Sequence, residues 1–220
     1  IKFCINNTNI IDIANFFLVV SKKFKFFIKS AKKIIIGITG STGSILGIRL
    51  LEILSGTDVE THLIISKWGH QTLEHETSYT YDEVTAMANV HYSPGDMGAA
   101  VSSGSFQTEG MVIIPCSMAS LASISSGQGT HLIHRAADVI IKEQRKLVLV
   151  ARETPLNQIH LENMLKLARM GVCIAPPMMA FYNHPEKIGS MVDHIVMRVL
   201  DQFDINVGTM PRWEGKMKQP

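Results

Sequence analysis

The sequence predicts an α/β fold with a three-layer, doubly wound parallel sheet of the Rossmann-like class. Uncharged runs rich in β-branched residues, such as 34–38 and 147–151, are typical of strands buried on both faces. Apolar residues at helical spacing follow the first run, at Ile45, Ile48 and Leu51. Because strands and helices alternate without an internal repeat, we expect helices to connect parallel strands and to cover both faces of the sheet.

The composition indicates one globular domain. The chain has 220 residues, of which 46% are hydrophobic and 18% are charged, which suffices for a full core. A formal net charge of +2 is too small to indicate nucleic acid or an anionic membrane as the main partner. The cysteines, Cys4, Cys116 and Cys173, are odd in number and lack C-x-x-C spacing, which favours a reducing compartment over a disulfide framework.

Residues 1–32 differ from residues 33–220, which we expect to form the domain with a C-terminal arm. Asp12 is the single acid among many lysines, and the apolar run 16–20 is too short to span a bilayer. The basic cluster follows that run, the reverse of a secretory signal. We therefore expect an organelle-targeting leader or a disordered extension, two alternatives that the sequence leaves open.

The first strand ends in a loop of small residues. Its spacing, Gly37-x-x-Gly40-x-x-Gly43, matches neither the dinucleotide fingerprint nor a P-loop. Such a loop lets a phosphate approach the backbone and the positive end of the following helix. The stretch predicts a phosphate cradle, with a tight turn that binds no ligand as the alternative.

The next elements complete a β-α-β unit and extend it. We expect a second strand over 59–66, a helix over 67–76, another helix over 79–89 and a turn over 93–96. The polar loop 99–106 shows no periodicity. It is a linker unless the fold places it at a site.

The run 111–120 repeats the pattern of the first strand and loop. An apolar strand is expected to break at Pro115, and small residues then open a helix whose spacing continues through Ile140. This start is a second candidate anion cradle. A buried strand over 147–151 follows.

The remaining elements close the domain. We expect an amphipathic helix over 159–170, a short last strand over 172–175 and a final helix over 188–203. The tail 209–215 reads as an arm.

The strand ends carry the candidate chemistry. In a parallel sheet the carboxyl ends share one edge, so the loop after Gly37 and Ser66 should face the same crevice. Arg152 and Glu153 follow a strand directly, where they could bind a phosphate and move a proton. An ordinary surface ion pair is the alternative.

Other polar residues have simpler explanations when taken alone. We expect Arg135, Lys142 and Arg145 to share a solvated helix face, with Asp138 and Lys142 as an i, i+4 pair.

Three aromatic or cationic residues lie near the end of the chain. Tyr182 and Arg198 fit a core tyrosine and a surface arginine, whereas Trp213 in an exposed tail is typical of a residue that packs on a partner or lines a pocket.

Metal binding and cysteine chemistry find little support. The nine histidines do not stand at ligand spacing with cysteines or carboxylates, so no metal site is predicted. Cys116 could be a thiolate at a helix start, but no base accompanies it, and a small packed residue is the better interpretation.

Several ordered motifs resemble the flavin prenyltransferase family, in particular its fungal mitochondrial branch, long called phenylacrylic acid decarboxylase. The resemblance covers residues 33 to about 216 and excludes the leader. The motifs are 37–43 (GITGSTG), 65–69 (ISKWG), 102–106 (SSGSF), 114–117 (IPCS), 135–138 (RAAD), 152–155 (RETP), 159–164 (IHLENM), 180–182 (AFY) and 211–214 (PRWE).

The resemblance implies a flavodoxin-like subunit in a dodecamer that binds reduced FMN and dimethylallyl monophosphate without a metal. Such enzymes join the prenyl group to N5 and C6 of the flavin, and the prenylated FMN serves a partner decarboxylase of the ferulic acid or ubiquinone-pathway type. It also implies a mitochondrial location, with the cytoplasm as the alternative.

The resemblance also implies roles for individual residues. Glu76 and Glu153 would manage protons, and Trp213 would help to enclose the allylic group. Lys142 and Thr42 would also take part in catalysis. FMN would be held by Gly40, Ser41, Thr42, Ser66, Ser117, Met118, Ala119, Ser120 and Arg152. The prenyl phosphate would meet Arg135, Lys142, Tyr182 and Arg198. One departure is Met178-Met179 in place of an apolar-proline step, which leaves the Tyr182 loop less fixed.

Three other functions compete with prenyl transfer. A flavin-dependent decarboxylase of cysteine-containing peptides shares the architecture but carries a catalytic histidine and an asparagine loop where this chain has 115–118. A non-catalytic flavin-binding or assembly subunit is a second alternative. A nicotinamide dehydrogenase would need an acid where Ser66 ends the second strand.

Overall fold

The sheet is parallel throughout, as the sequence predicts. The structure, a computed structural model, describes residues 32–208, 212, 213 and 215, so nearly all of the predicted leader lies outside the described residues. The sheet has six strands in the order β3-β2-β1-β4-β5-β6. The strands are β1 (Lys33–Ile38), β2 (Glu60–Ile65), β3 (Val90–Tyr92), β4 (Gly110–Cys116), β5 (Lys146–Ala151) and β6 (Cys173–Ile174).

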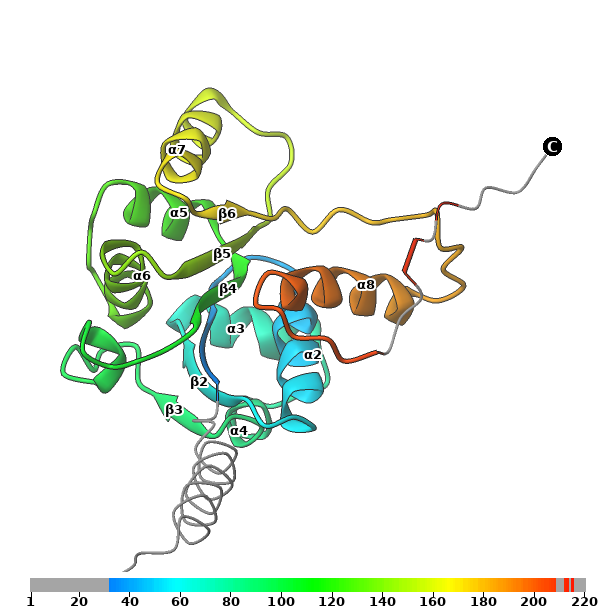
Figure 1. The fold of residues 1–220 in the computed structure, drawn as a ribbon, viewed down its shortest axis with the longest axis horizontal. Coiled ribbons are helices and arrows are strands. Elements are labelled where there is room, and N and C mark those ends of the chain that lie inside the picture. The colour runs from blue at the N-terminus through cyan, green and yellow to red at the C-terminus, as the bar shows by residue number, and fades with distance from the viewer. Residues whose placement is uncertain (1–31, 209–211, 214, 216–220) are drawn as a thin grey trace, which may run out of the picture. The chain divides into compact units, whose positions relative to one another are not determined.

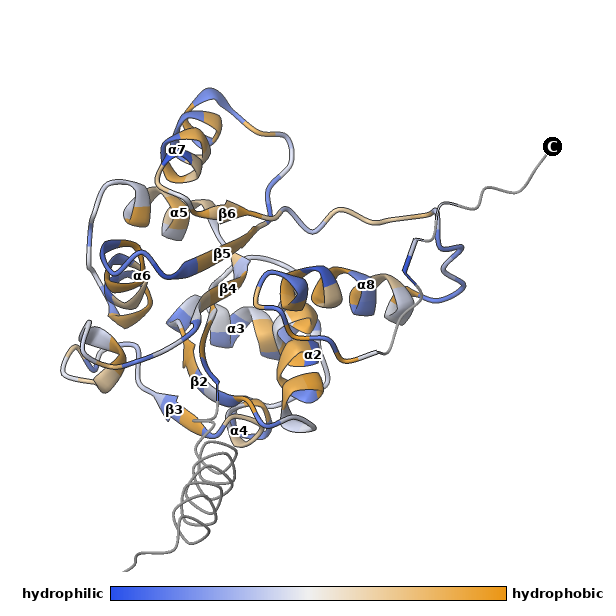
Figure 2. Ribbon diagram, viewed as in Figure 1, coloured by the Kyte–Doolittle hydropathy of each residue, from blue (hydrophilic) through white to orange (hydrophobic). Residues whose placement is uncertain are grey.

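Helices cover both faces of the sheet (Figure 1). They are α2 (Ser44–Ser55), α3 (Lys67–Glu76), α4 (Tyr81–Ala86), the short 3₁₀ helix η1 (Ala100–Ser102), α5 (Met118–Ser125), α6 (Leu132–Lys142), α7 (Gln158–Arg169) and α8 (Ile188–Asp201). Alternate residues of β1 supply the two layers: Ile34 and Ile36 pack toward α2 and α8, and Ile35 packs toward α5 and α6. Figure 2 shows the apolar residues concentrated on the strands and on the helix faces that cover them.

The structure corrects two expectations about β4 and the helices after it. Strand β4 continues through Pro115 to Cys116, with a shift in its pairing to β5 between Ile113 and Cys116 that accommodates the missing N–H. The single helix expected through Ile140 is two helices, because residues 126–131 interrupt it and Gly127 has φ of 72°.

Two further corrections concern α4 and α6. Helix α4 is shorter than predicted, and the chain after it forms β3 on the edge of the sheet. Arg145 lies beyond the end of α6, and Asp138 pairs with Arg135 at 2.7 Å rather than with Lys142, whose partner is Glu143.

Acid should destabilise the fold through the buried residue His134, which is 5% exposed. Its imidazole shares a 2.8 Å hydrogen bond with the Thr130 hydroxyl and lies against the tilted ring of His131, with 3.8 Å between the ring centroids. Burial, helped by His131, lowers the pKa of His134 to about 4. The unfolded chain, with a pKa of about 6.5, therefore takes up this proton first, and the free energy of unfolding falls as the pH falls from about 6.5 toward 4.

Urea unfolding at several pH values measures this effect. His134→Gln should flatten the fall in unfolding free energy, whereas replacement of the exposed His75 by glutamine should leave it unchanged. An equally steep acid dependence in His134→Gln would contradict the assignment.

Candidate active site

Thr39 joins the first two loops at the carboxyl edge of the sheet. Its side chain is fully buried, and its hydroxyl donates to the Pro115 carbonyl at 2.9 Å while it accepts from the Ser117 N–H at 2.8 Å. The Thr39 N–H also donates to Pro115 at 3.2 Å. Sequence reasoning missed this residue, although its place at the end of a strand, before the small-residue loop, was a usable signal. Thr39 holds the start of the first loop against the end of β4.

Three loops line an open cavity at this edge, and Ser66, which was expected to face the same crevice, is not part of its lining. The cavity measures about 210 Å³ and is lined by Gly40, Ser41, Thr42, Ser117, Met118, Arg152 and Glu153. The Ser41 hydroxyl donates to the Arg152 carbonyl at 3.3 Å, and the Arg152 N–H donates to the Cys116 carbonyl at 3.2 Å. These hydrogen bonds connect the loops after β1, β4 and β5. The predicted pair of Arg152 and Glu153 lies here, with both side chains exposed and neither in an ion pair within the described part of the chain.

The second predicted anion cradle begins α5. Ser117 caps this helix by accepting from the Ser120 N–H at 3.3 Å, and its hydroxyl donates to the Ser120 hydroxyl at 3.2 Å. Ser120 is buried behind Ser117, whereas Ala119 is exposed in the first turn and does not line the cavity. The first N–H groups of a helix have no partner within it. Together with Ser117 and Met118, they make this helix start suitable for holding an anion or a polar ring edge.

The first predicted cradle differs from expectation because the chain supplies its own anion. One carboxylate oxygen of Glu76 accepts from the N–H groups of Gly43 and Ser44 at 2.8 and 3.2 Å. An acid at this position stabilises the start of α2 by hydrogen bonding and by its favourable position on the helix dipole. Glu76, predicted to manage protons, is thus a helix cap in this structure and does not line the cavity.

Gly40 lines the cavity and Ser66 does not, but both residues fix the conformation of the loops around it. Ser66 caps α3 by accepting from the Gly69 N–H at 3.0 Å, and its own N–H donates to Ile38 at 2.9 Å. Gly40 packs so closely on α3 that a Cβ atom there would lie 2.3 Å from the Cβ of Trp68. Glycine is therefore required at position 40 by this close approach.

A second cluster contains candidate residues that lie far along the chain from the first loop. After β6, residues 175–187 leave the sheet as an extended arm, and α8 returns from its tip (Figure 1). Tyr182 on this arm meets Trp213 and His194 edge-on, with ring centroids 5.8 and 5.6 Å apart. The structure thus brings Tyr182 and Trp213 together, although nothing in their spacing predicted it.

Arg198 lies beside this aromatic group. It lines a cavity of about 220 Å³ together with His194 and Met178. Its guanidinium donates to Asp201 at 2.6 Å, and Arg212 binds the same carboxylate at 2.6 Å. Both arginines hold the pKa of Asp201 below its usual range, with the Arg212 hydrogen bond as the main cause. Two cations around one carboxylate leave the cluster with an excess positive charge that suits a phosphate.

Arg135 and Lys142 stand apart from both cavities. The Arg135 guanidinium donates to the Ser102 carbonyl at 3.3 Å and pairs with Asp138. Lys142 ends α6 just before β5 begins, at the amino-terminal edge of the sheet. The structure does not bring either residue to Arg152 within one subunit.

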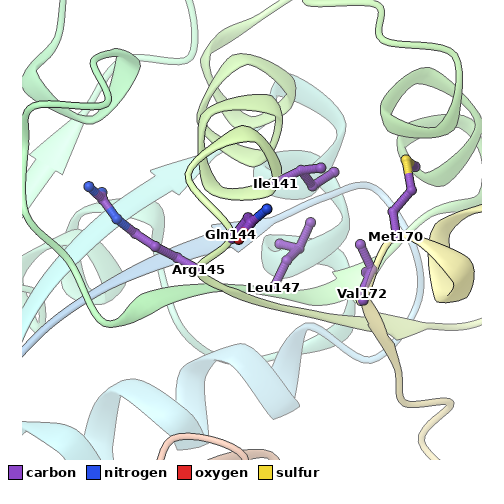
Figure 3. A pocket seen from close by; sticks show the side chains of 7 residues that line it. Ile141, Gln144, Arg145, Leu147, Met170 and Val172 are labelled. Atoms are coloured by element: carbon purple, nitrogen blue, oxygen red, sulfur yellow. The ribbon is translucent and has the colours of Figure 1, made fainter.

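A further cavity of about 270 Å³ lies at this opposite edge (Figure 3). Its lining is Ile141, Gln144, Arg145, Leu147, Met170, Gly171 and Val172. The Arg145 side chain points away from Met170 and Val172, and its guanidinium is bound by the Gly104 and Phe106 carbonyls at 2.7 Å each. This lining offers no free acid or base for catalysis.

Cysteine and metal chemistry do not emerge at the carboxyl edge. Burial raises the pKa of the Cys116 thiol to about 12, so the thiolate is not formed near neutral pH. Among the described residues no group of three or more histidine, cysteine or acidic side chains could hold a metal ion.

Within the part of the chain that the structure describes, no helix has the length and hydrophobicity needed to cross a membrane.

The residues at the carboxyl edge fit a phosphorylated flavin. Ser41, Thr42 and Ser117 offer hydroxyl groups at the cavity, and Arg152 offers a cation. Small residues allow a planar ring to approach the backbone closely. This set of donors can hold FMN without any metal ligand.

Comparisons with known proteins agree with this assignment. Residues 28–200 match the family model described as Flavoprotein. A probable UbiX-like flavin prenyltransferase of Bacillus subtilis is 57% identical over 85% of this chain and 92% of its own length. The mitochondrial flavin prenyltransferase PAD1 of Saccharomyces cerevisiae is 55% identical over 84% of this chain and 76% of its own length.

Solved structures give the same result. A dodecameric FMN-dependent UbiX-like decarboxylase of Escherichia coli O157:H7 matches with a TM-score of 0.82 at 54% identity, over 83% of this chain and all of its own. AnUbiX (PadA1), solved with FMN and dimethylallyl pyrophosphate, matches with a TM-score of 0.83 at 48% identity, over 84% of this chain and 99% of its own. The FMN-dependent cysteine decarboxylase SpaF, at 14% identity and a TM-score of 0.55, shares the fold alone.

The cavity should depend on the Thr39 hydroxyl. Thr39→Val keeps the shape of the side chain but leaves the partly buried Ser117 N–H without its acceptor. We expect a loss of about 1–3 kcal/mol in the free energy of unfolding, together with weaker FMN binding because the loops after β1 and β4 separate.

Urea unfolding and FMN fluorescence titration measure the two effects. Thr39→Ser, which keeps the hydroxyl, is the matched control and should retain most FMN affinity. Equal FMN affinity in all three proteins would show that this hydrogen bond does not shape the site.

Proposed function

The chain belongs to the UbiX-like flavin prenyltransferases of the Flavoprotein family, and on that premise we propose that it transfers a dimethylallyl group to reduced FMN. The observation that carries the proposal is the cavity at the carboxyl edge, where Gly40, Ser41, Thr42, Ser117 and Arg152 meet. The enzyme is a transferase, and its prenyl donor is a dimethylallyl phosphate ester.

FMN binds at the carboxyl edge of β1, β4 and β5 in this proposal. Reduced FMN supplies the nucleophilic N5 and C6 positions to which the dimethylallyl group becomes attached. The Thr42 hydroxyl can donate a hydrogen bond to the ligand. The Ser41 and Ser117 hydroxyls, whose protons go to the Arg152 carbonyl and the Ser120 hydroxyl, can accept one, and Arg152 neutralises negative charge. Gly40 lets the ligand approach the backbone, while Ser66 and Ser120 hold the adjoining helix starts in place.

Glu153 is the candidate for proton transfer in the cavity. It lines the cavity beside Arg152, and one of its carboxylate oxygens accepts from the Thr154 N–H at 3.2 Å. An ionised carboxylate at this position can accept the proton that leaves C6 when the carbon–carbon bond at C6 forms, after the carbon–nitrogen bond at N5. Glu76 can share this role only by leaving the N–H groups of Gly43 and Ser44.

The prenyl phosphate is assigned to the cluster on the arm. Tyr182 donates a hydrogen bond, Arg198 supplies positive charge to the leaving phosphate, and Trp213 covers the allylic group. Met178, Met179 and Phe181 on the same arm are 78%, 59% and 64% exposed. Apolar side chains at such exposures favour contact with another protein surface.

We propose that the arm of one subunit completes the cavity of another. The cavity and the arm cluster have separate linings within one subunit, and a related structure is described as dodecameric. A site shared between copies would bring Arg152 of one subunit to Tyr182 and Arg198 of its neighbour. Arg135 and Lys142 remain candidates for the prenyl phosphate only if they too are presented by another copy.

The proposal also covers the branch of the family, the location in the cell and the enzyme that uses the product. We infer that the chain belongs to the fungal mitochondrial branch, because its basic segment precedes the domain and PAD1 is a mitochondrial relative. Bacterial relatives are as similar to the chain, so the cytoplasm is the alternative location. The prenylated FMN would serve a separate decarboxylase that depends on this cofactor.

Prenyl transfer can be tested directly. The protein, mixed without oxygen with reduced FMN and dimethylallyl monophosphate, should yield a flavin heavier by one dimethylallyl unit in mass spectrometry, and dimethylallyl pyrophosphate in parallel tests donor choice. Glu153→Gln should lower the rate about a hundredfold, whereas replacement of the exposed Glu109 by glutamine should not. An unchanged flavin mass with folded, FMN-bound protein would refute the proposal.

Subunit complementation tests the shared site. Arg152→Ala and Arg198→Ala should each be inactive alone, because each lacks one half of every site. Co-expression of the two variants should restore about a quarter of the wild-type activity, since random mixing pairs an intact cavity with an intact arm at that frequency. Mixed oligomers without activity would place both halves in the same subunit.

A further inference from the structure

His194 is a buried titratable residue that the proposed mechanism does not use. It lies on α8, its side chain is 6% exposed, and it lines the same cavity as Arg198. Its Nε2 atom lies 3.5 Å from the Tyr182 hydroxyl, and the rings meet edge-on. This separation is at the long limit of a hydrogen bond, as is common for catalytic contacts that tighten when the ligand binds.

The hydrogen-bonding pattern indicates which nitrogen of His194 carries the proton. The Nδ1 atom is buried and has no hydrogen-bond partner among the described residues. A buried N–H without an acceptor is rarely tolerated, so the proton belongs on Nε2, where it can be donated to the Tyr182 oxygen. The phenolic proton of Tyr182 is then free to be donated to another acceptor.

The surroundings keep His194 neutral. Burial lowers its pKa, and Arg198 on the same helix adds to this effect, while Asp201 opposes it. Asp201 is itself neutralised by Arg198 and by Arg212 from the tail. The other acid beside it on α8, Asp193, is paired with Arg49 of α2 at 2.6 Å.

The arm packs against His194, and the residue of the arm that faces the imidazole is Tyr182. A neutral imidazole therefore contributes direction rather than charge.

We propose that His194 is a positioning residue for the prenyl donor: its Nε2–H holds the Tyr182 oxygen so that the phenolic proton points to a phosphate oxygen. This inference rests on the proposed function, because Tyr182 is the group that meets the phosphate. His194 itself touches neither the flavin nor the reacting carbon. The ligand class is an alkyl phosphate ester whose phosphate accepts a hydrogen bond from Tyr182.

The first experiment examines the protein without substrate. The imidazole ¹⁵N spectrum of the assembled protein should show His194 neutral and protonated at Nε2, and Tyr182→Phe should shift that resonance. A charged His194, or a proton on Nδ1, would overturn the proposal whether or not the protein prenylates FMN. The tautomer thus separates failure of this inference from failure of the proposed function.

The second experiment measures how tightly the protein binds the prenyl donor. His194→Leu should raise the KM for dimethylallyl monophosphate about fivefold, the value of one hydrogen bond, with kcat within about twofold. His194→Gln, whose amide N–H can replace Nε2–H, should restore KM. Calorimetric titration of the donor into protein loaded with oxidised FMN, which cannot react, should show the same order of affinities.

A double-variant comparison excludes a merely structural effect. In the Tyr182→Phe background, His194→Leu should have no further effect on KM or donor affinity, because the oxygen that His194 holds is gone. A fivefold loss of affinity in both backgrounds would mean that His194 acts through the fold of α8 and not through Tyr182. An unchanged KM in His194→Leu would also overturn the proposal.

Discussion

The carboxyl edge of the sheet depends on hydrogen bonds that join three separate loops. Thr39 donates to Pro115 and accepts from Ser117, and the loop after β5 is attached through Ser41 and Arg152. Burial of a hydroxyl costs free energy unless its hydrogen bonds are made. The same bonds fix the distance between the small-residue loop and the start of α5. The cavity therefore takes its shape from polar contacts, while the apolar layers on either side set only the position of the strands.

The charges at this edge differ from those expected of a phosphate-binding loop, because a carboxylate of the chain itself occupies the start of α2. The start of α2 is already neutralised by the Glu76 carboxylate, so the cation of Arg152 and the start of α5 remain as the groups available to an anion. A carboxylate that caps a helix is an ordinary stabilising device. Its presence moves the expected anion site toward β4 and β5, where Arg152 and Glu153 lie side by side in sequence and can serve binding and proton transfer separately.

The arm carries a second set of groups with a different physical character. Tyr182 of the arm meets His194 of α8 and Trp213 of the tail edge-on, and beside them Asp201 holds Arg198 and Arg212 together. Large apolar side chains on the arm are exposed within one subunit, which favours burial against another copy. A site assembled from a cavity and an arm would exclude water when subunits associate, and a dry site protects a carbocation-like state during prenyl transfer.

The sequence by itself determined the parallel sheet, the positions of most strands and helices, and the loops at the carboxyl edge, because hydrophobic period and small-residue turns are local properties. Only the tertiary structure decided that β4 runs through Pro115, that Glu76 caps α2 and that His194 and Trp213 meet Tyr182 of the arm. It also separated Lys142 from the cavity. These outcomes depend on contacts between residues distant in sequence, and spacing along the chain carries no information about which of those contacts are geometrically possible.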